Sequence, residues 1–244
     1  MKNLIHIVKS LLVSSVLFLN LSKLSNVSKL YKNSDEFLKF QHILEAINYI
    51  RVAGISGAAI SQVYYEFGCH SGRTFSSAIN SARFLKMNNM KFYAFDSFEG
   101  LPAVENSEGG YFKAGEYSTS VENFLGIVKG KTGVALNKDN IVKGFYCDSL
   151  TPELQESLPK VGVVHIDVDL YSSTVSVLNF IKPLLTVGSV LLFDDWYCYP
   201  PNGESGECRA VKEFIIKNSN ITLKEWKSYS TFGQSFFVTS LTSP

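Results

Sequence analysis

The sequence predicts an α/β fold, a doubly wound and mostly parallel sheet with helices on both faces. Three observations support this prediction. Short β-rich runs alternate five times with helical patterns between residues 63 and 218. Two later runs, 161–166 and 188–193, are continuously apolar, as is typical of strands covered on both faces. The last two runs, 221–226 and 235–239, leave no room for a helix between them and predict an antiparallel hairpin.

The first residues, 1–34, are expected to form an extension that precedes the main domain, residues 35–244. An apolar stretch flanked by Lys2 and Lys9 is similar to a secretory signal, but Lys9 interrupts it and no small-residue cleavage site follows. The uninterrupted part is shorter than the ~20 residues of a membrane-spanning helix. We therefore expect a helix that contacts a partner subunit, in a cytoplasmic protein. A signal or membrane-associated segment stays open as the alternative.

The remaining elements follow from periodicity and from start and stop signals. Apolar residues at helical spacing predict a helix over 36–51, which Gly54 and Gly57 end. The loop over 97–117 is long for a compact domain, and such loops are usually functional, for example as lids. The other elements are predicted as strand 63–67, helix 73–87, strand 91–95, helix 119–129, strand 140–146, a short helix from 152, strand 161–166, helix 172–185, strand 188–193 and helix 206–218.

Composition narrows the classes of function. The 244 residues carry a formal net charge of +1, with 45% hydrophobic and 18% charged residues, which is ordinary for a globular protein. Such a chain lacks the strong basic field of nucleic-acid binders, so we expect a small-molecule substrate and no nucleic acid. The four cysteines form no CxxC pair, which argues against a structural zinc site.

A glycine loop follows the first predicted strand. In Glu66-x-Gly68-x-x-x-Gly72, glycines between a strand and a helix would let the backbone approach a ligand closely. Asp96 ends the next strand, where an acidic residue commonly binds ribose hydroxyls. The loop contains neither GxGxxG nor a Walker lysine, which favours a nucleoside without a diphosphate cradle over NAD or ATP. A plain strand-to-helix turn is the alternative.

Three aspartates end the two continuously apolar strands. If those strands are neighbours, Asp167, Asp194 and Asp195 lie about 5 Å apart at one edge of the sheet. Clustered carboxylates are costly unless they are protonated or bind a cation, and oxygen ligands suit Mg²⁺, Mn²⁺ or Ca²⁺ rather than zinc. Solvated loop aspartates are the alternative, and Asp169 is expected to cap the helix that follows.

The histidines and aromatic residues near these motifs do not point to a single role. His165 lies inside an apolar strand and is expected to be a hydrogen-bonded core histidine, while His70 lies in the glycine loop without an assigned role. An aromatic wall for a substrate ring, or a dimer interface, could be formed by Tyr111, Tyr117, Trp196, Tyr197 and Tyr199.

Several runs, taken together and in this order, resemble the macrocin O-methyltransferase family, which are class I S-adenosylmethionine-dependent enzymes. The resemblance extends from about Leu38 to near the C-terminus. Arg73 and Val168 depart from it, since the family often has glycine at both positions. The runs are Glu66-Phe67-Gly68, Phe95-Asp96-Ser97-Phe98-Glu99-Gly100-Leu101-Pro102, His165-Ile166-Asp167-Val168-Asp169-Leu170-Tyr171-Ser172-Ser173-Thr174 and Phe193-Asp194-Asp195.

The resemblance implies a Rossmann-like seven-stranded sheet and S-adenosylmethionine as the cofactor. Glu66, Gly68 and Gly72 would lie along the amino-acid end of the cofactor, Asp96 at its ribose, and Asp148 near its adenine. Ser71 and Ser97, in the same two loops as these residues, complete the expected cofactor-binding set.

The resemblance also implies Mg²⁺ on Asp167, Asp194 and Asp195, and methylation of a hydroxyl on a sugar or glycosylated small molecule. We expect Asp167 to act as the general base, because it would lie at the cation and beside the cofactor. A homo-oligomer is possible. Two alternatives stay open, an NAD-dependent oxidoreductase and a non-catalytic nucleoside-binding protein on the same sheet.

Overall fold

The computed structural model describes residues 24–103, 112–199 and 203–242. Within them a seven-stranded sheet has the order β3-β2-β1-β4-β5-β7-β6. β1 to β5 are parallel and β7 runs antiparallel to both β5 and β6, so the predicted sheet with its C-terminal hairpin is confirmed. The strands are β1 (Val63–Phe67), β2 (Lys91–Asp96), β3 (Ile141–Lys143), β4 (Val163–Ile166), β5 (Val190–Phe193), β6 (Ile221–Tyr229) and β7 (Gly233–Leu241).

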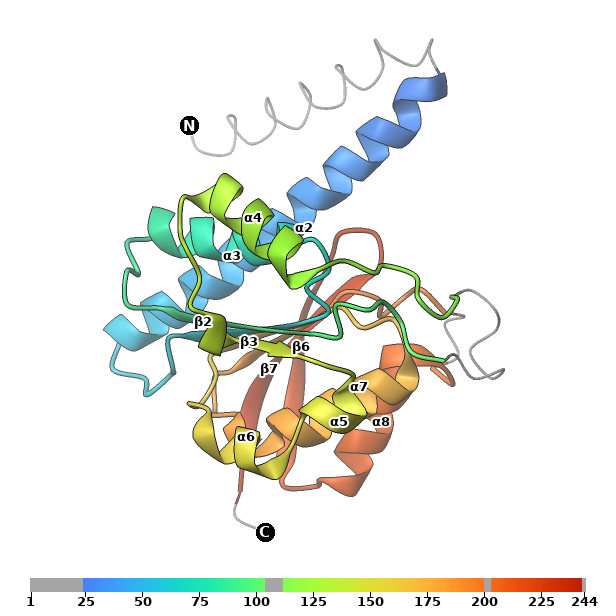
Figure 1. Ribbon diagram of the computed structural model, residues 1–244. Coiled ribbons are helices and arrows are strands. Elements are labelled where there is room, and N and C mark those ends of the chain that lie inside the picture. Colours follow the sequence, from blue (N-terminus) through green and yellow to red (C-terminus); the bar gives the residue numbers. More distant parts are fainter. Residues whose placement is uncertain (1–23, 104–111, 200–202, 243–244) are drawn as a thin grey trace.

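Helices cover both faces of this sheet, as Figure 1 shows. One face carries the helices α2 (Leu24–Ile55), α3 (Arg73–Phe84) and α4 (Val121–Thr132), and the other carries α5 (Tyr146–Ser149), α6 (Pro152–Ser157), α7 (Tyr171–Ile181) and α8 (Gly206–Lys217). Short 3-10 turns lie at Lys138–Asn140 and Lys182–Leu184. Each face has its own buried apolar core, so consecutive residues of β1 alternate between two cores.

The long helix α2 is the first described element. The predicted helix over 36–51 lies inside it, and the expected boundary at 34/35 between extension and domain falls within α2 as well. Its C-terminal half packs against α3 and buries Ile43 and Ile47, while its Leu24 end projects beyond the domain (Figure 1). The apolar start with Lys2 and Lys9 lies outside the described residues. Among the described helices, none combines the length and the apolar character needed to cross a bilayer.

Several predicted elements end earlier than expected, among them the helix predicted over 73–87, which ends at Phe84. The strand predicted over 140–146 stops at Lys143, because Gly144 takes a positive φ of 139° and turns the chain into α5. The Ser149 hydroxyl donates to the Gly144 carbonyl at 3.1 Å and closes this turn. The helix predicted over 172–185 ends at Ile181, and Pro183 lies in the 3-10 turn that follows.

The prediction that Asp169 caps the following helix, α7, is wrong. Leu170, and not Asp169, occupies the N-cap position, without a capping side chain. Asp169 has a left-handed φ of 58°, and its backbone N–H donates to Asp195 Oδ2 at 3.2 Å. It therefore belongs to the carboxylate cluster and not to the helix.

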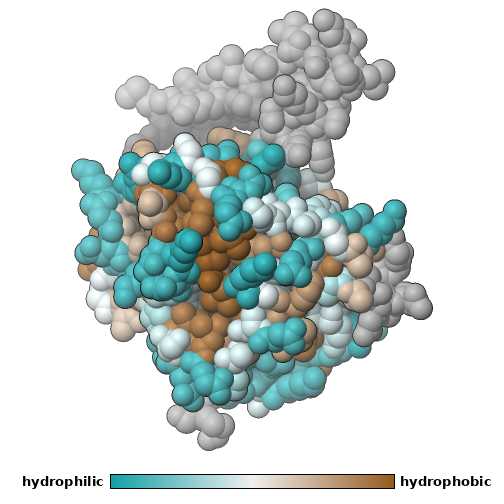
Figure 2. Space-filling model, viewed as in Figure 1, coloured by the Kyte–Doolittle hydropathy of each residue, from teal (hydrophilic) through white to brown (hydrophobic). Residues whose placement is uncertain are grey.

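Apolar surface is exposed near the edge of the sheet. Figure 2 shows it as a brown band where β2 and β3 lie in Figure 1. Ile141 and Val142 of β3 are half-buried, and β3 pairs with another strand on one side only. Homo-oligomerisation, expected from the sequence, stays a prediction.

Candidate active site

A cavity of about 570 Å³ opens at the carboxyl ends of β1, β2, β4 and β5, where ligands of open α/β sheets bind. The described arms of the 97–117 loop contribute to its wall and are hydrogen-bonded to each other, from the Leu101 N–H to the Glu116 carbonyl at 2.9 Å. Residues 104–111 of the expected lid lie outside the described residues. Six residues predicted for cofactor or metal line the cavity together, namely Gly68, Asp96, Ser97, Asp167, Asp194 and Asp195.

The glycines of the loop are needed for internal packing. Gly68 has a φ of 83°, and a Cβ there would lie 1.7 Å from the Asp167 carbonyl oxygen. Gly72 has a φ of 74° at the start of α3, and a Cβ there would lie 2.8 Å from the side chains of Phe124 and Val128. Gly68 thus lets the end of β1 lie directly against the end of β4, which brings the glycine loop beside Asp167.

Asp96 joins the glycine loop to the loop after β2. Its Oδ2 accepts the His70 N–H at 2.7 Å and its Oδ1 accepts the Phe98 N–H at 2.6 Å. The Ser97 hydroxyl donates to the Gly100 carbonyl at 2.7 Å and orders the turn that follows. Because a carboxylate oxygen can accept two hydrogen bonds, Asp96 keeps capacity for ligand hydroxyls at the cavity wall.

The three predicted aspartates meet at one point. Asp167 follows β4, and Asp194 and Asp195 follow the neighbouring β5. One carboxylate oxygen from each lies within 4.8 Å of the others, with Asp167 half-buried and the other two buried. The oxygens are close enough to share one hard cation, and oxygen donors suit Mg²⁺.

The surroundings shift the pKa values of the three aspartates in different directions. Burial and the charges of Asp194 and Asp195 hold the pKa of Asp167 well above its usual range. Burial and the charge of Asp194 raise the pKa of Asp195 to about 6. Burial alone would raise the pKa of Asp194 too, but His165 and Lys39 outweigh it and lower that pKa to about 2. The cluster titrates as a unit in which Asp194 ionises first.

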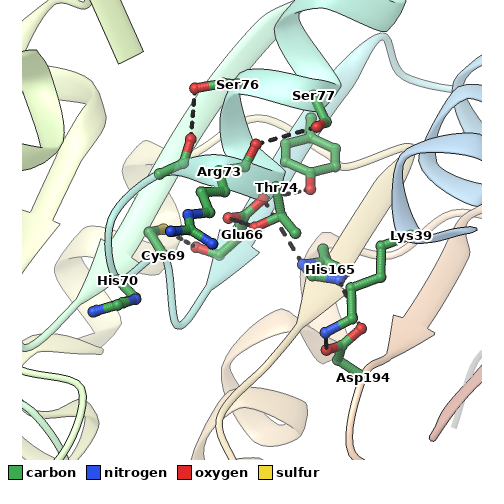
Figure 3. A network of polar contacts seen from close by, with 12 residues as sticks. Lys39, Glu66, Cys69, His70, Arg73, Thr74, Ser76, Ser77, His165 and Asp194 are labelled. Atoms are coloured by element: carbon green, nitrogen blue, oxygen red, sulfur yellow. Dashed lines mark hydrogen bonds and ion pairs between the residues drawn. The ribbon is translucent and has the colours of Figure 1, made fainter. Parts of the chain in front are cut away.

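A row of ionisable side chains runs from Glu66 on β1 to the aspartate cluster (Figure 3). His165 on β4 is fully buried, with Nδ1 3.8 Å from Glu66 Oε2 and Nε2 3.6 Å from Asp194 Oδ1. Burial would lower the pKa of His165, yet Asp194 and Glu66 raise it above its ordinary value. The core position predicted for His165 is confirmed, but its ring nitrogens lie beyond hydrogen-bonding distance of the neighbouring carboxylates of Glu66 and Asp194. Lys39 of α2 ends the row with an ion pair to Asp194.

A further buried carboxyl group is hydrogen-bonded to the backbone of the cluster. Glu207 of α8 is fully buried, and its Oε2 accepts the backbone N–H of Asp195 at 3.0 Å. Burial and the charges of Asp195 and Asp194 raise its pKa well above the usual range. Its hydrogen bond holds the backbone of Asp195 in place.

Four predicted cofactor residues do not line the cavity. Glu66 is fully buried under the glycine loop, where it accepts the Thr74 and Tyr64 hydroxyls at 2.7 and 2.5 Å. Its pKa is raised by burial. Gly72 is the N-cap of α3, and Ser71 directly precedes it. Asp148 is exposed on α5, where its neighbours Tyr146 and Cys147 line the cavity instead.

The aromatic wall is much smaller than predicted. Of the expected aromatic residues that are described, Tyr117 alone lines the cavity, and Tyr111 lies outside the described residues. Trp196 packs between Phe193 and Phe236 in the core. Tyr197 donates a hydrogen bond to Gln234 and Tyr199 to the Asp169 carbonyl, so both support the structure.

Several lining residues were not predicted from the sequence. Lys39 reaches the cavity from α2, and Arg73 reaches it from the first turn of α3. The first turns of α7 add hydroxyl groups from Ser172, Ser173 and Ser176. Ser172 and Ser173 lie in the run that carried the family resemblance, which was a usable signal. Lys39 lies in an amphipathic helix far earlier in the sequence, and no pattern there indicated that it would line the cavity.

Residues 38–222 match the macrocin-O-methyltransferase (TylF) family. No curated protein sequence matches the chain. Solved structures give a TM-score of 0.64 with the O-methyltransferase NovP, at 20% identity over 82% of this chain and 79% of that one. For CalS11, a calicheamicin methyltransferase, the TM-score is 0.59 at 18% identity, over 81% and 78%.

A third solved structure is the O-methyltransferase TomG from Streptomyces achromogenes in complex with SAM. Its TM-score is 0.50 at 13% identity, over 80% of each chain. Identities this low show a similarity of fold alone, and that fold is the Rossmann-like sheet described above. The family match covers most of the chain, and this protein therefore belongs to the macrocin O-methyltransferase (TylF) family of S-adenosylmethionine-dependent O-methyltransferases.

Proposed function

We propose that the protein transfers a methyl group from S-adenosylmethionine to a hydroxyl of a sugar or glycosylated small molecule, with the assistance of Mg²⁺. The observation that carries this proposal is a single cavity that combines Asp96 and Gly68, predicted for the cofactor, with the cluster of Asp167, Asp194 and Asp195. A cation and a nucleoside cofactor held there would lie side by side.

The cavity suits S-adenosylmethionine. Its volume of about 570 Å³ falls in the range of ~300–1,000 Å³ that is typical of small-molecule sites. Asp96 can accept ribose hydroxyls at one wall, while Tyr146 and Cys147 of α5 offer a surface where the adenine was predicted. Glu66 supports the glycine loop through Thr74 without lining the cavity, so its proposed role is to position that loop.

The aspartate cluster suits a divalent cation. Asp167, Asp194 and Asp195 each offer one oxygen. Burial and neighbouring carboxylates raise the pKa values of Asp167 and Asp195, and a dication would offset both effects. Bound there, Mg²⁺ would supply Lewis acidity that lowers the pKa of an acceptor hydroxyl.

Asp167 is the residue that we propose takes the proton of the acceptor hydroxyl. It is the most exposed of the three aspartates, and its pKa is held well above the usual range by burial and by its two neighbours. A carboxylate that lines the cavity can reach an acceptor bound there, as a general base must. Gly68 places the glycine loop directly against the Asp167 backbone, so cofactor and base would be held in a fixed relation.

Three features support a sugar as the acceptor. The family carries the description macrocin-O-methyltransferase, and CalS11, which has a similar fold, is described as a TDP-rhamnose 3'-O-methyltransferase. The cavity wall formed by α7 presents Ser172, Ser173 and Ser176, and Tyr117 lies in the same cavity. Hydroxyl groups beside one aromatic ring are suited to bind a polyhydroxylated ring.

The experiment is a calorimetric titration of S-adenosylhomocysteine, and of NAD in parallel, into the purified protein with Mg²⁺ or EDTA. We expect micromolar binding of S-adenosylhomocysteine and none of NAD. The Asp167→Ala variant should bind S-adenosylhomocysteine but transfer no methyl group to sugar acceptors. Full activity of that variant, or of the wild type in excess EDTA, would refute the metal-assisted scheme. Binding of NAD alone would favour the oxidoreductase alternative.

A further inference from the structure

The ammonium of Lys39 occupies the aspartate cluster. Lys39 comes from α2, lines the cavity, and forms an ion pair with Oδ2 of the buried Asp194 (Figure 3). A lysine ammonium is positively charged at neutral pH. Lys39 therefore brings a positive charge to one of the three carboxylates of the cluster.

The two oxygens of Asp194 face different surroundings. Oδ1 is fully enclosed and lies 3.6 Å from His165 Nε2 in the core. Oδ2 is the oxygen that Lys39 binds. A cation that enters from the cavity would thus meet Asp194 at the oxygen that the lysine already holds.

A second carboxylate is available to the displaced lysine. Asp35, one helical turn earlier on α2, lies with its Oδ2 3.6 Å from the Lys39 Nζ. Both side chains are about one-fifth exposed at this edge, so the ammonium can move toward Asp35 and solvent without crossing the core. Oδ1 of Asp35 accepts the backbone N–H and the hydroxyl of Thr231, both at 3.0 Å, which ties α2 to the β6–β7 turn.

We propose that a divalent cation binds to the cluster by displacing the Lys39 ammonium from Asp194, and that Lys39 thereby sets how tightly the cation is held. The reason is electrostatic. An ammonium and a dication on one carboxylate oxygen repel each other, and three carboxylates suffice to balance the dication without the lysine. This inference rests on the metal site proposed above and assigns a role to a residue outside the aspartate set.

The test measures Mn²⁺ binding to metal-free, full-length protein at pH 8, by the electron paramagnetic resonance signal of free Mn²⁺. Lys39→Met keeps the length of the side chain and removes the charge, and should bind Mn²⁺ about tenfold more tightly. Lys39→Arg keeps the charge and should bind like the wild type. The matched control is Lys91→Met, which removes an exposed lysine at the start of β2, away from the cavity. It should leave Mn²⁺ binding unchanged.

Each result decides between the two proposals. Equal or weaker Mn²⁺ binding by Lys39→Met, beside clear binding by the wild type, would overturn displacement and leave the metal site in place. No Mn²⁺ binding by either protein, in samples that still bind S-adenosylhomocysteine, would overturn both while leaving methyl transfer. Binding by Lys39→Met alone would support displacement and remove Mg²⁺ from the wild-type reaction. Should Lys39→Met not fold, Lys39→Gln serves as the second uncharged variant.

Discussion

Replacement of Gly68 by alanine tests whether the close approach of β1 to β4 organises the site. Gly68 has a left-handed φ of 83°, and its backbone N–H donates to the Phe95 carbonyl at 2.9 Å. A Cβ at this position would lie 1.7 Å from the carbonyl oxygen and 2.7 Å from the carbonyl carbon of Asp167. Both atoms are backbone, so no change of rotamer can relieve the overlap.

The expected loss of stability has two parts. A left-handed conformation costs alanine ~1–2 kcal/mol relative to glycine. Overlap with a packed neighbour adds ~1–3 kcal/mol, since the ends of two strands must move apart. Gly133 provides a matched control, because it has a φ of 72° at the end of α4 and no described residue lies within 4 Å of its added Cβ. Gly133→Ala should therefore lose the first part alone.

Urea unfolding measures both variants against the wild type, from the midpoints at unchanged slope. We expect Gly68→Ala to lose about 3 kcal/mol and Gly133→Ala about 1 kcal/mol. Equal losses would refute the reasoning, because they would mean that the chain yields freely at the contact between Gly68 and Asp167. Folded Gly68→Ala protein should also bind S-adenosylhomocysteine poorly, while Gly133→Ala should bind it normally.

Two further predictions concern single side chains. His42 is buried with Nε2 2.9 Å from the Ser235 hydroxyl, and burial lowers its pKa to about 4, so only the unfolded chain takes up its proton between pH 6.5 and 4. Stability should therefore fall with pH in that window, and relative to His42→Gln the wild type should lose about 2 kcal/mol from pH 6.5 to 5 in urea unfolding. Cys147 is exposed and lines the cavity, so iodoacetamide should modify it ahead of the buried Cys69. S-adenosylhomocysteine should slow that modification in mass spectra, and an unchanged rate would contradict the adenine position at α5.

The sheet could be predicted because strong local patterns agreed with each other. Continuous apolar runs such as 188–193 identified β5 as a buried parallel strand, and the short spacing after 226 identified the hairpin. The convergence of Asp167 with Asp194 followed from one further assumption, that their strands are neighbours, which the sheet order confirms. Residues that directly follow strands are placed by the sheet itself, and so a strand prediction locates them.

The rest of the site depends on contacts that no local pattern contains. Lys39 lies 155 positions before Asp194, and only the packing of α2 brings the two side chains together. The packing role of Gly68 is equally hidden, since the atoms that exclude a Cβ belong to Asp167 on another strand. Asp148 does not line the cavity for a local reason, because the strand before it ends at Lys143 and the short helix α5 leaves its side chain exposed.

The surroundings of the three aspartates also support the assignment of Asp167 as the base. Asp194, paired with Lys39 and beside His165, has its pKa lowered to about 2 and is the weakest base. Asp195 has both oxygens engaged, with Oδ1 accepting the Cys198 thiol and Oδ2 the Asp169 N–H, each at 3.2 Å. Asp167 is the most exposed of the three, and burial and its two neighbours hold its pKa well above the usual range. Neighbouring residues thus favour different proposed tasks for three chemically identical side chains, and Lys39 of the distant helix α2 is one of these neighbours.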